Sequence, residues 1–176
     1  MIATEQKDIR LNLGGRGTRI PGFLTVDVSE DHDVDLRADV SKLPLEENSV
    51  SEIYASQILE HLPHLKTKDV LKEWHRVMKP GARIYIGVPD FQRAVDLFRQ
   101  CGLTNYIVNF LYGDQIYDKA FHYAPFNFAR LAGLLYEIGF KEIRRLSQMP
   151  YGLNDCSSLV ANTDHLSVSL NVEAKK

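Results

Sequence analysis

The sequence predicts an α/β fold built on a largely parallel sheet, because strand-like and helix-like segments alternate along the chain. Several of the strand-like segments end at a glycine or an aspartate, and the helix-like ones carry apolar residues at helical spacing. The length of 176 residues suits a single domain with one sizeable core, so we expect residues 1–176 to form one domain.

Five apolar segments are expected as strands, and two further segments close the sheet. Arg83–Val88 is apolar nearly throughout, which is typical of a strand buried on both faces. The seven expected strands are Asp8–Leu13, Phe23–Val28, Val34–Val40, Ser49–Ser56, Arg83–Val88, Lys141–Gln148 and His165–Ala174.

The first expected helix is Lys66–Met78, in which the apolar residues recur at helical spacing. The run Lys79-Pro80-Gly81 is expected to stop it. We interpret Trp74, Tyr54 and Phe140 as core residues rather than substrate contacts.

Two more helices are predicted from their capping residues. Phe91–Cys101 follows Asp90, a suitable N-cap, and precedes Gly102. Asn127–Phe140 repeats the pattern, with its own first asparagine as the cap and Gly139 as the terminator.

Composition and charge exclude several kinds of partner. The formal net charge is −2 and the longest basic cluster is Arg144-Arg145, so we expect no nucleic-acid partner. No apolar run reaches the length of a membrane span, and the first ten residues lack the apolar stretch of a signal peptide, so no membrane partner is expected. Cys101 and Cys156 are too few for a disulfide framework, and we expect a reduced, cytoplasmic protein.

Residues from about Asn105 to Pro125 fit neither the helical nor the strand period. We interpret this stretch as an irregular insertion that forms a binding loop or lid on the substrate side. It is rich in aromatic and amide side chains, among them Tyr106, Asn109, Tyr112, Gln115 and Tyr117.

The stretch "RLNLGGRGTR" places Gly14, Gly15 and Gly17 directly after the first expected strand, where a ligand can approach the backbone closely. A phosphate-binding P-loop is excluded, because Thr18 stands where that motif needs lysine. A dinucleotide fingerprint is excluded as well, because its third glycine would fall at Ile20 and no helix follows. A tight turn without a ligand remains an alternative.

Two aspartates favour a nucleoside ligand at this turn. Asp27 ends the second expected strand, where a carboxylate can accept both hydrogen bonds from a ribose diol. Asp39 ends the third, where a carboxylate can accept a hydrogen bond from an adenine amine. A nucleoside lying across the carboxyl ends of these strands would use both residues.

With these features the sequence resembles the class I S-adenosylmethionine-dependent methyltransferases, in the small branch related to the ubiquinone and polyketide-type enzymes. The resemblance lies in "LNLGGRG", "GFLTVDV", "LAGLLYEIGF" and above all "LPLEENSVSEIYASQILEHL" followed by "LKEWHRVMKPGA". It implies a Rossmann-like, mostly parallel seven-stranded sheet and S-adenosylmethionine as the cofactor.

The resemblance also implies where the cofactor lies. Its methionine half would run along the glycine turn, its ribose would sit on the second strand end and its adenine near the third. The residues implied in cofactor binding are Asn12, Gly14, Gly15, Gly17, Asp27, Val28, Asp39, Val40 and Ser56. Glu60 and His61 would begin the next helix at the mouth of the site.

The chain departs from the family pattern in its first half. Asn12 stands where the family usually has an acidic residue, and Arg16 enters the glycine turn, where it would close the turn in part or pair with the methionine carboxylate. The connections Gly17–Phe23 and Ser29–Asp33 are too short for crossover helices, although we still expect parallel strands. Such a sheet with reduced helices needs cover from a second subunit or from the C-terminal segment, and we expect a homo-oligomer.

If the acceptor is a hydroxyl, methyl transfer needs a general base, and His61 and His122 are the candidates. Some relatives bind a divalent ion through Glu-x-x-Glu-His at this place and a histidine from the later loop. Gln57, Glu60 and His61 stand at these positions on one side of a helix, but Gln57 is a weak ligand, and we expect no metal.

The resemblance predicts an enzyme that methylates a small polar acceptor, with a hydroxyl of a sugar or secondary metabolite as the leading candidate. The alternative is a non-catalytic partner or regulatory subunit that still binds the cofactor. Asn12, Arg16 and the missing helices fit that alternative, whereas Asp27 and Asp39 argue that the cofactor still binds.

Overall fold

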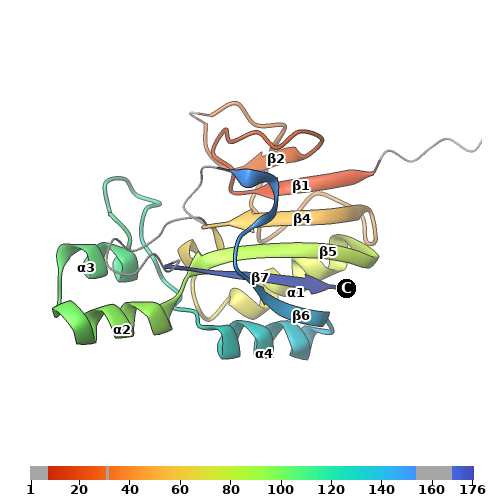
Figure 1. Ribbon diagram of the computed structural model, residues 1–176. Coiled ribbons are helices and arrows are strands. Elements are labelled where there is room, and N and C mark those ends of the chain that lie inside the picture. Colours follow the sequence, from red (N-terminus) through yellow and green to blue (C-terminus); the bar gives the residue numbers. More distant parts are fainter. Residues whose placement is uncertain (1–7, 31, 154–167) are drawn as a thin grey trace, which may run out of the picture.

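The computed structural model describes residues 8–30, 32–153 and 168–176, which form a seven-stranded sheet in the order β3-β2-β1-β4-β5-β7-β6 (Figure 1). The strands are β1 (Ile9–Leu13), β2 (Leu24–Asp27), β3 (Leu36–Arg37), β4 (Val50–Ser56), β5 (Met78–Pro89), β6 (Lys141–Leu146) and β7 (Ser169–Lys175). The helices are α1 (Thr67–Val77), α2 (Phe91–Cys101), α3 (Asn105–Tyr112) and α4 (Phe128–Ile138), with short 3₁₀ turns η1 (Leu59–His61) and η2 (Pro150–Gly152).

The sheet is mixed rather than purely parallel. The strands from β3 through β5 pair in parallel, as the sequence predicts. β7 pairs antiparallel with both β5 and β6, which corrects the expectation at this end of the sheet. The last expected strand begins within residues 154–167, which lie outside the described part of the chain, and is seen from Ser169.

The parallel arrangement of β1, β2 and β3 holds although no helix lies in the described part of either connection. Arg19 braces the two connections through an ion pair with Asp33 of 2.8 Å and a second one with Asp35. Asp35 also accepts a hydrogen bond from the Thr25 amide at 2.8 Å. These side-chain contacts take the place of helix packing, and β3 shortens from the expected Val34–Val40 to two residues.

Helices α1 and α4 lie side by side on one face of the sheet and bury the main core against it. Trp74 and Phe140 are almost fully buried there, as predicted, and the Trp74 indole donates to the Val40 carbonyl at 2.9 Å. Tyr54 is buried as well, but in a second cluster on the opposite face, with Phe23 and Met149.

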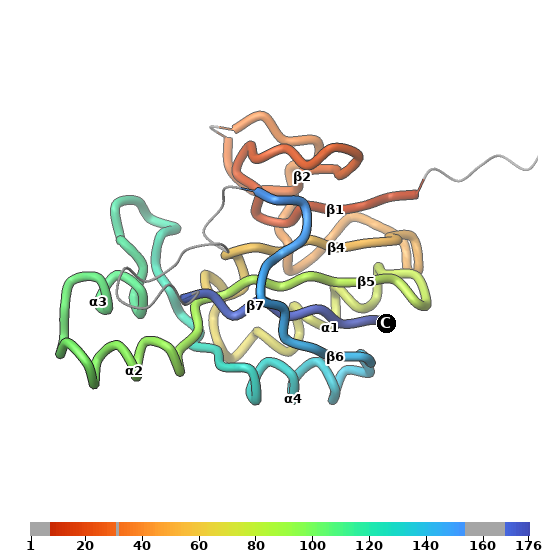
Figure 2. Tube along the Cα trace, viewed as in Figure 1, coloured from red at the N-terminus to blue at the C-terminus, as the bar shows by residue number. Residues whose placement is uncertain are grey.

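That opposite face is covered by the chain that follows β6, and none of the described helices packs over it. Figure 2 shows this segment crossing in front of β5 and β4. Met149 is buried there, and the ring of Tyr151 meets those of Phe23 and Tyr54 edge to face, with centroids 5.1 Å and 5.9 Å apart. Residues 147–153 thus provide part of the cover that the sequence assigns to the C-terminal segment or to a second subunit, and the homo-oligomer stays a prediction.

The capping residues in the sequence correctly predict two helices. The Asp90 side chain accepts a hydrogen bond from the Gln92 amide at 3.1 Å, and α2 covers the predicted residues. The Asn127 side chain accepts from the Arg130 amide at 2.9 Å, and Gly139 ends α4 in the left-handed conformation.

One expectation is wrong at the level of elements, and one strand begins earlier than expected. Residues 105–112 form helix α3 rather than irregular structure, because Thr104 caps it and Ile107 packs on Leu97 of α2 and on Val168. The run Lys79-Pro80-Gly81 ends α1 but already belongs to β5, where Gly81 donates to the carbonyl of the chain's last residue at 2.9 Å.

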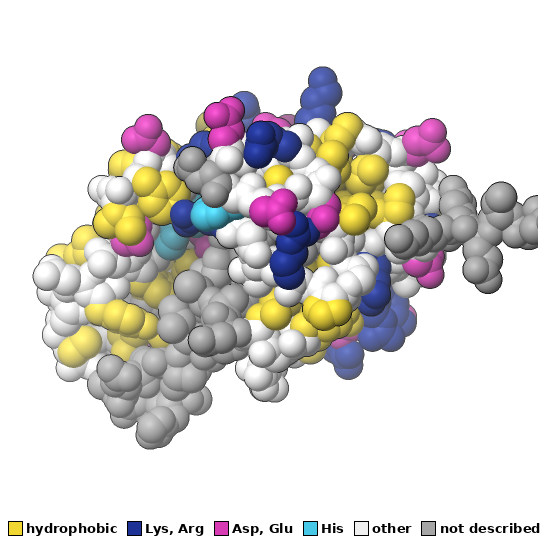
Figure 3. Space-filling view, turned by 90° about the horizontal axis from the view of Figure 1, so that it is seen from above, with side chains coloured by type: hydrophobic (Ala, Val, Ile, Leu, Met, Phe, Trp, Pro, Cys, Tyr) yellow, Lys and Arg dark blue, Asp and Glu magenta, His cyan; other side chains and the backbone are white. Residues whose placement is uncertain are grey.

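The surface seen from above carries acidic and basic side chains intermixed with hydrophobic ones, and a histidine lies beside a basic side chain (Figure 3). Within the described residues, no helix combines the length and the apolar character needed to cross a membrane.

Candidate functional site

A pocket of about 1550 Å³ opens at the carboxyl ends of β1, β2 and β4, between the glycine turn and α3. A typical small-molecule site encloses roughly 300 to 1,000 Å³, so this one has room for a cofactor and an acceptor together. The predicted residues that line it are Gly14, Gly15, Asp27, Val28, Asp39, Val40, Ser56, His61 and His122. Asn12 and Gly17 do not line it.

The packing around the turn requires glycine at Gly14 and Gly15. A Cβ added at Gly14 would come within 2.7 Å of the Ile58 side chain, and one at Gly15 within 2.4 Å of the Asn12 amide nitrogen. Gly14 has φ +69°, a conformation that other residues rarely adopt. The floor of the pocket at this point is therefore bare backbone, which a ligand can approach closely.

Asn12 supports this turn from below. Its side-chain nitrogen donates to the Thr18 carbonyl at 2.8 Å, and it is buried. A carboxylate has no proton to donate to that carbonyl when ionised, so asparagine suits this position where the family usually has an acid. Its contribution to cofactor binding stays a prediction, as does that of Gly17.

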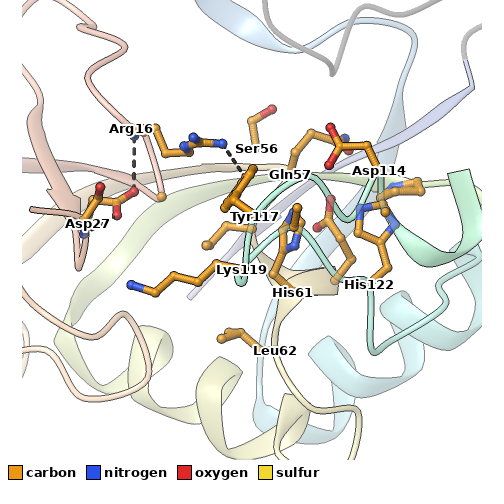
Figure 4. Close-up of a pocket in the computed structure, with 18 of the residues that line it drawn as sticks. Arg16, Asp27, Ser56, Gln57, His61, Leu62, Asp114, Tyr117, Lys119 and His122 are labelled. Atoms are coloured by element: carbon orange, nitrogen blue, oxygen red, sulfur yellow. Dashed lines mark hydrogen bonds between the residues drawn. The ribbon is translucent and has the colours of Figure 1, made fainter. Parts of the chain in front are cut away.

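Asp27 is the best-defined polar group at the end of the pocket near the glycine turn. One carboxylate oxygen accepts from the Arg16 amide at 3.2 Å and the other from the Ser29 amide at 2.8 Å. These bonds hold the carboxylate at the end of β2, in the pocket wall (Figure 4). Since an ionised carboxylate accepts about four hydrogen bonds, both oxygens can still receive a hydroxyl.

Asp39 and Val40 follow β3 and line the same end of the pocket. Asp39 is exposed, and its side chain accepts from the Ser41 amide at 2.8 Å. Val40 is buried and anchored to the core through the hydrogen bond of its carbonyl with Trp74. A polar acceptor and an apolar wall therefore lie next to each other, as the nucleoside prediction requires.

Ser56 ends β4 beside the glycine turn, and Gln57 follows it. Among the described residues, neither the Ser56 hydroxyl nor the Gln57 side-chain nitrogen has a hydrogen-bond partner, although both atoms are buried. Gln57 has φ 53°, so it does not share a helix face with Glu60 and His61, and η1 is a 3₁₀ turn of three residues rather than the start of the expected helix. Buried polar atoms of this kind are groups that a bound ligand would satisfy.

Arg16 points away from the turn, across the pocket. Its guanidinium stacks on the Tyr117 ring, 4.4 Å from the centroid, and donates a hydrogen bond to the Tyr117 hydroxyl. Figure 4 shows this contact bridging the turn and the segment after α3. Arg16 thus joins the two sides of the pocket.

His61 of η1 and His122 of the segment after α3 lie together in the pocket, with ring centroids 4.8 Å apart. Nδ1 of His61 lies 2.9 Å from the Phe121 carbonyl, and Nδ1 of His122 lies 3.0 Å from the Phe110 carbonyl. Burial lowers the pKa of both imidazoles, so both are neutral at pH 7. The structure thus brings together two histidines that are 61 residues apart in the sequence.

Glu60 is buried beside them, and among the described residues neither carboxylate oxygen has a hydrogen-bond partner. Burial raises the pKa of this carboxyl to about 8. The sequence places Glu60 at the mouth of the site but carries no signal that its side chain turns inward.

Lys119 is a pocket residue that the sequence reasoning missed. Its side chain extends into the pocket from the segment after α3, toward the side of Asp27 (Figure 4). The available signal was a lysine within a stretch that is rich in aromatic and amide residues.

The family comparison agrees with this geometry. Residues 21–86 match a family model described as a methyltransferase domain. No curated protein matches the chain by sequence.

Solved structures share the fold at low sequence identity. A SAM-dependent methyltransferase from Archaeoglobus fulgidus is 16% identical, with a TM-score of 0.63, and the match covers 96% of this chain and 86% of that one. One from Methanosarcina mazei is 17% identical, with a TM-score of 0.65 and coverage of 98% and 93%. A methyltransferase from Burkholderia thailandensis that acts at N1 of 1,6-didemethyltoxoflavin is 15% identical, with a TM-score of 0.57 and coverage of 96% and 70%.

The family match and the shared fold confirm the resemblance that the sequence predicts. Residues 21–86 match a methyltransferase domain, and the chain shares its fold with solved S-adenosylmethionine-dependent methyltransferases.

Proposed function

We propose that the chain is a methyltransferase that binds S-adenosylmethionine in this pocket and passes its methyl group to a small polar acceptor. The observation that carries the proposal is Asp27, whose carboxylate is held at the end of β2 by two backbone amides and stands in the pocket wall. A carboxylate so placed in an α/β sheet is suited to the two hydroxyls of a ribose.

The other residues of this end fit the remaining parts of the cofactor. Val40 offers an apolar wall to an adenine ring, and Asp39 offers an acceptor for its amine. The bare backbone at Gly14 suits the amino-acid half, as does the Ser56 hydroxyl, which has no hydrogen-bond partner among the described residues. The neighbour from Burkholderia thailandensis was solved with S-adenosylhomocysteine bound, which supports this choice of cofactor.

The chemistry of methyl transfer asks little of the protein beyond alignment. The bound cofactor supplies a methyl group on a sulfonium, which is already a good leaving group, so the residues mainly hold the acceptor in line with it. His61 and His122 are neutral at pH 7, so either can accept the proton of an acceptor hydroxyl. Both histidines line the pocket on the side of α3.

The acceptor would lie between the histidines and α3. Tyr106 and Asn109 of α3 and Lys119 beyond it offer polar groups along that wall. These side chains suit a hydroxylated acceptor such as a sugar or a secondary metabolite, and the bound 1,6-didemethyltoxoflavin of the Burkholderia thailandensis neighbour is likewise a small molecule.

Calorimetric titration with S-adenosylmethionine and S-adenosylhomocysteine tests the proposal. We expect Asp27→Ala and Asp27→Asn to weaken binding by roughly 10- to 100-fold, since each removes a charged hydrogen-bond acceptor. Asp69→Ala, which changes an exposed aspartate on α1, serves as the matched control. Unchanged affinity in both Asp27 variants would contradict the assignment of this site.

The titration, combined with a screen for methyl transfer, separates the enzyme from the regulatory or partner subunit that the sequence leaves open. Binding followed by methyl transfer in a screen of small polar acceptors supports the enzyme. Binding with no transfer to any acceptor class would favour a regulatory or partner subunit. Absence of binding at millimolar ligand would overturn both.

A further inference from the structure

Three hydrogen-bond acceptors converge in the pocket on the side of α3. Glu60 and His61 belong to η1, and His122 belongs to the segment after α3. One side-chain atom of each residue lies within 4.8 Å of the other two, and Figure 4 shows the two imidazoles side by side. Three acceptors that each bind one tetrahedral nitrogen at about 2.9 Å lie about 4.7 Å apart. The cluster is therefore wide enough for one ammonium nitrogen at its centre.

The tautomers of the two imidazoles leave an acceptor free in each ring. Nδ1 of His61 and Nδ1 of His122 lie 2.9 and 3.0 Å from backbone carbonyls, which only accept hydrogen bonds. The ring proton is therefore on Nδ1 in both residues, and Nε2 carries a lone pair. The two histidines thus offer a ligand acceptors rather than donors.

Glu60 adds a carboxylate to these two acceptors. The residue is 1% exposed, and among the described residues both of its carboxylate oxygens lack a hydrogen-bond partner. A buried carboxylate without a partner is costly, and either a proton or a bound cation relieves that cost. The backbone carbonyl of Glu60 accepts from the amides of Tyr123 and Ala124 at 2.7 and 3.2 Å, which holds η1 against the segment that bears His122.

The charges around the cluster also favour a cation. Asp114 lies beside His122 (Figure 4), and its charge acts on both imidazoles, where it opposes the lowering of their pKa by burial. Among the described residues, the lysine and arginine that line the pocket are Lys119 and Arg16. Lys119 extends away from the histidines toward Asp27, and the guanidinium of Arg16, which lowers the pKa of His61, is stacked on a tyrosine ring.

We propose that Glu60, His61 and His122 bind the protonated amino group of the methyl acceptor, which makes the acceptor a small primary amine. The proposal rests on the proposed function and names its substrate class. A primary ammonium has three N–H donors, one for each acceptor of the cluster. Aromatic rings attract a cation as well, and Tyr106 and Phe110 of α3 line the same pocket with their rings stacked, 6.5 Å between centroids.

An amine acceptor also matches the way charge moves in the reaction. The ammonium first gives one proton to the Glu60 carboxylate or to Nε2 of a histidine, which leaves a lone pair on nitrogen. That lone pair forms the bond to the methyl carbon, while the bond from this carbon to sulfur breaks and its electrons stay on sulfur. The positive charge thus passes from sulfur to nitrogen, where the carboxylates of Glu60 and Asp114 stabilise it.

Thermal melting at pH 8 in methylammonium chloride tests the cation site without any acceptor skeleton. Tetramethylammonium chloride, whose cation has no N–H donor, and NaCl at equal ionic strength are the references. We expect methylammonium to raise the melting temperature by at least about 2 °C over both, since a ligand that binds the folded state stabilises it. Glu60→Gln should remove most of this rise, and Asp114→Asn should reduce it. Glu46→Gln, the same change at an exposed glutamate outside the pocket, should retain it.

Three results of this measurement would overturn the cation site. They are equal effects of methylammonium and tetramethylammonium, a rise that persists in full in Glu60→Gln, and the absence of a rise in the unaltered chain. Circular dichroism identifies a variant that fails to fold. Asp114→Asn changes an exposed side chain and keeps the test decisive if Glu60→Gln does not fold.

Methyl transfer to matched pairs tests the substrate class. Each pair holds a primary amine and the alcohol of the same skeleton, such as 2-phenylethylamine and 2-phenylethanol, with radiolabelled S-adenosylmethionine as the donor. We expect transfer to the amines to exceed transfer to the alcohols by about tenfold or more. Preferential transfer to the alcohols, or transfer to neither, would overturn the amine class. Calorimetry with S-adenosylmethionine tests the proposed function separately, because the methylammonium response needs no cofactor.

Discussion

Asp27 and Glu60 show two opposite ways in which this chain holds a carboxylate. Asp27 has its oxygens bound by backbone amides at a strand end, whereas those of Glu60 have no partner within the described residues. The first is recognisable in the sequence, because an aspartate directly follows an apolar strand. The second is not, because the inward turn of Glu60 depends on η1 and on the loop that packs against it.

The stability of the protein should fall as pH rises from about 4.5 toward 8. Burial raises the pKa of Glu60 from 4.5 to about 8, so the folded state keeps a proton that the unfolded state has already lost in this range. The loss is on the order of a few kcal/mol. Urea unfolding across this pH range measures the loss.

Glu60→Gln is the control for this pH dependence, because it carries no titrating group and should flatten the decline. The facing groups are His61 and His122, whose lowered pKa values act in the opposite direction, since their protonation destabilises the folded state below about pH 6.5. Equal slopes for the wild type and for Glu60→Gln between pH 6.5 and 8 would contradict the burial of an unpaired carboxylate.

At the scale of elements, the contact between the glycine turn and the segment after α3 is the feature that the sequence leaves undecided. Arg16 was expected either to close the turn in part or to pair with the methionine carboxylate. The structure places it on Tyr117, where it links the two sides of the pocket. Both residues line the pocket, so this contact closes part of its wall.

Arg16→Ala should accelerate release of S-adenosylhomocysteine by roughly two- to fivefold, because an exposed cation–π contact contributes about 0.5 to 1 kcal/mol. Tyr117→Phe keeps the stacking and loses only the hydrogen bond, so its effect should be smaller. Surface plasmon resonance with immobilised protein measures both dissociation rates. Tighter binding by Arg16→Ala would instead mean that the arginine obstructs the site.

Helices α2 and α4 were predictable from their caps and apolar spacing, whereas α3 was not, although Thr104 caps it. Asp90, Asn127 and Gly139 mark the ends of α2 and α4 through bonds within one turn, which the local sequence determines. In α3 only Ile107 is fully buried, and it meets Leu97 and Val168, which lie elsewhere in the chain. The surrounding exposed tyrosines hid that pattern.

At the scale of the whole molecule, the segment after β6 substitutes for missing helices on one face of the sheet. Its Met149 is buried among Ile20, Phe23 and Tyr54. The neighbouring part of this face is charged, with Glu173 paired to Arg83 at 2.8 Å and to Arg144. Such a face needs less apolar cover than a doubly covered parallel sheet.

Met149→Ala should lower the free energy of unfolding by about 2 to 4 kcal/mol, because it removes a buried side chain and leaves a cavity. Leu65→Ala, at a side chain that is 84% exposed, is the matched control and should change stability by less than about 0.5 kcal/mol. Urea denaturation followed by circular dichroism compares the two. Equal stabilities would mean that residues 147–153 contribute little cover to the sheet.

The sequence by itself determined the α/β alternation, the glycine turn, the strand-end aspartates and the helix caps, because each depends on residues within a few positions of one another. The tertiary structure decided the antiparallel β7, the cover of the second face and the meeting of Glu60 and His61 with His122. Those features depend on which distant elements pack together, and packing is set by the shape and burial of the whole core rather than by any local pattern. The cluster of Glu60, His61 and His122 arises only at that level, since its members come from two segments that the fold brings into contact.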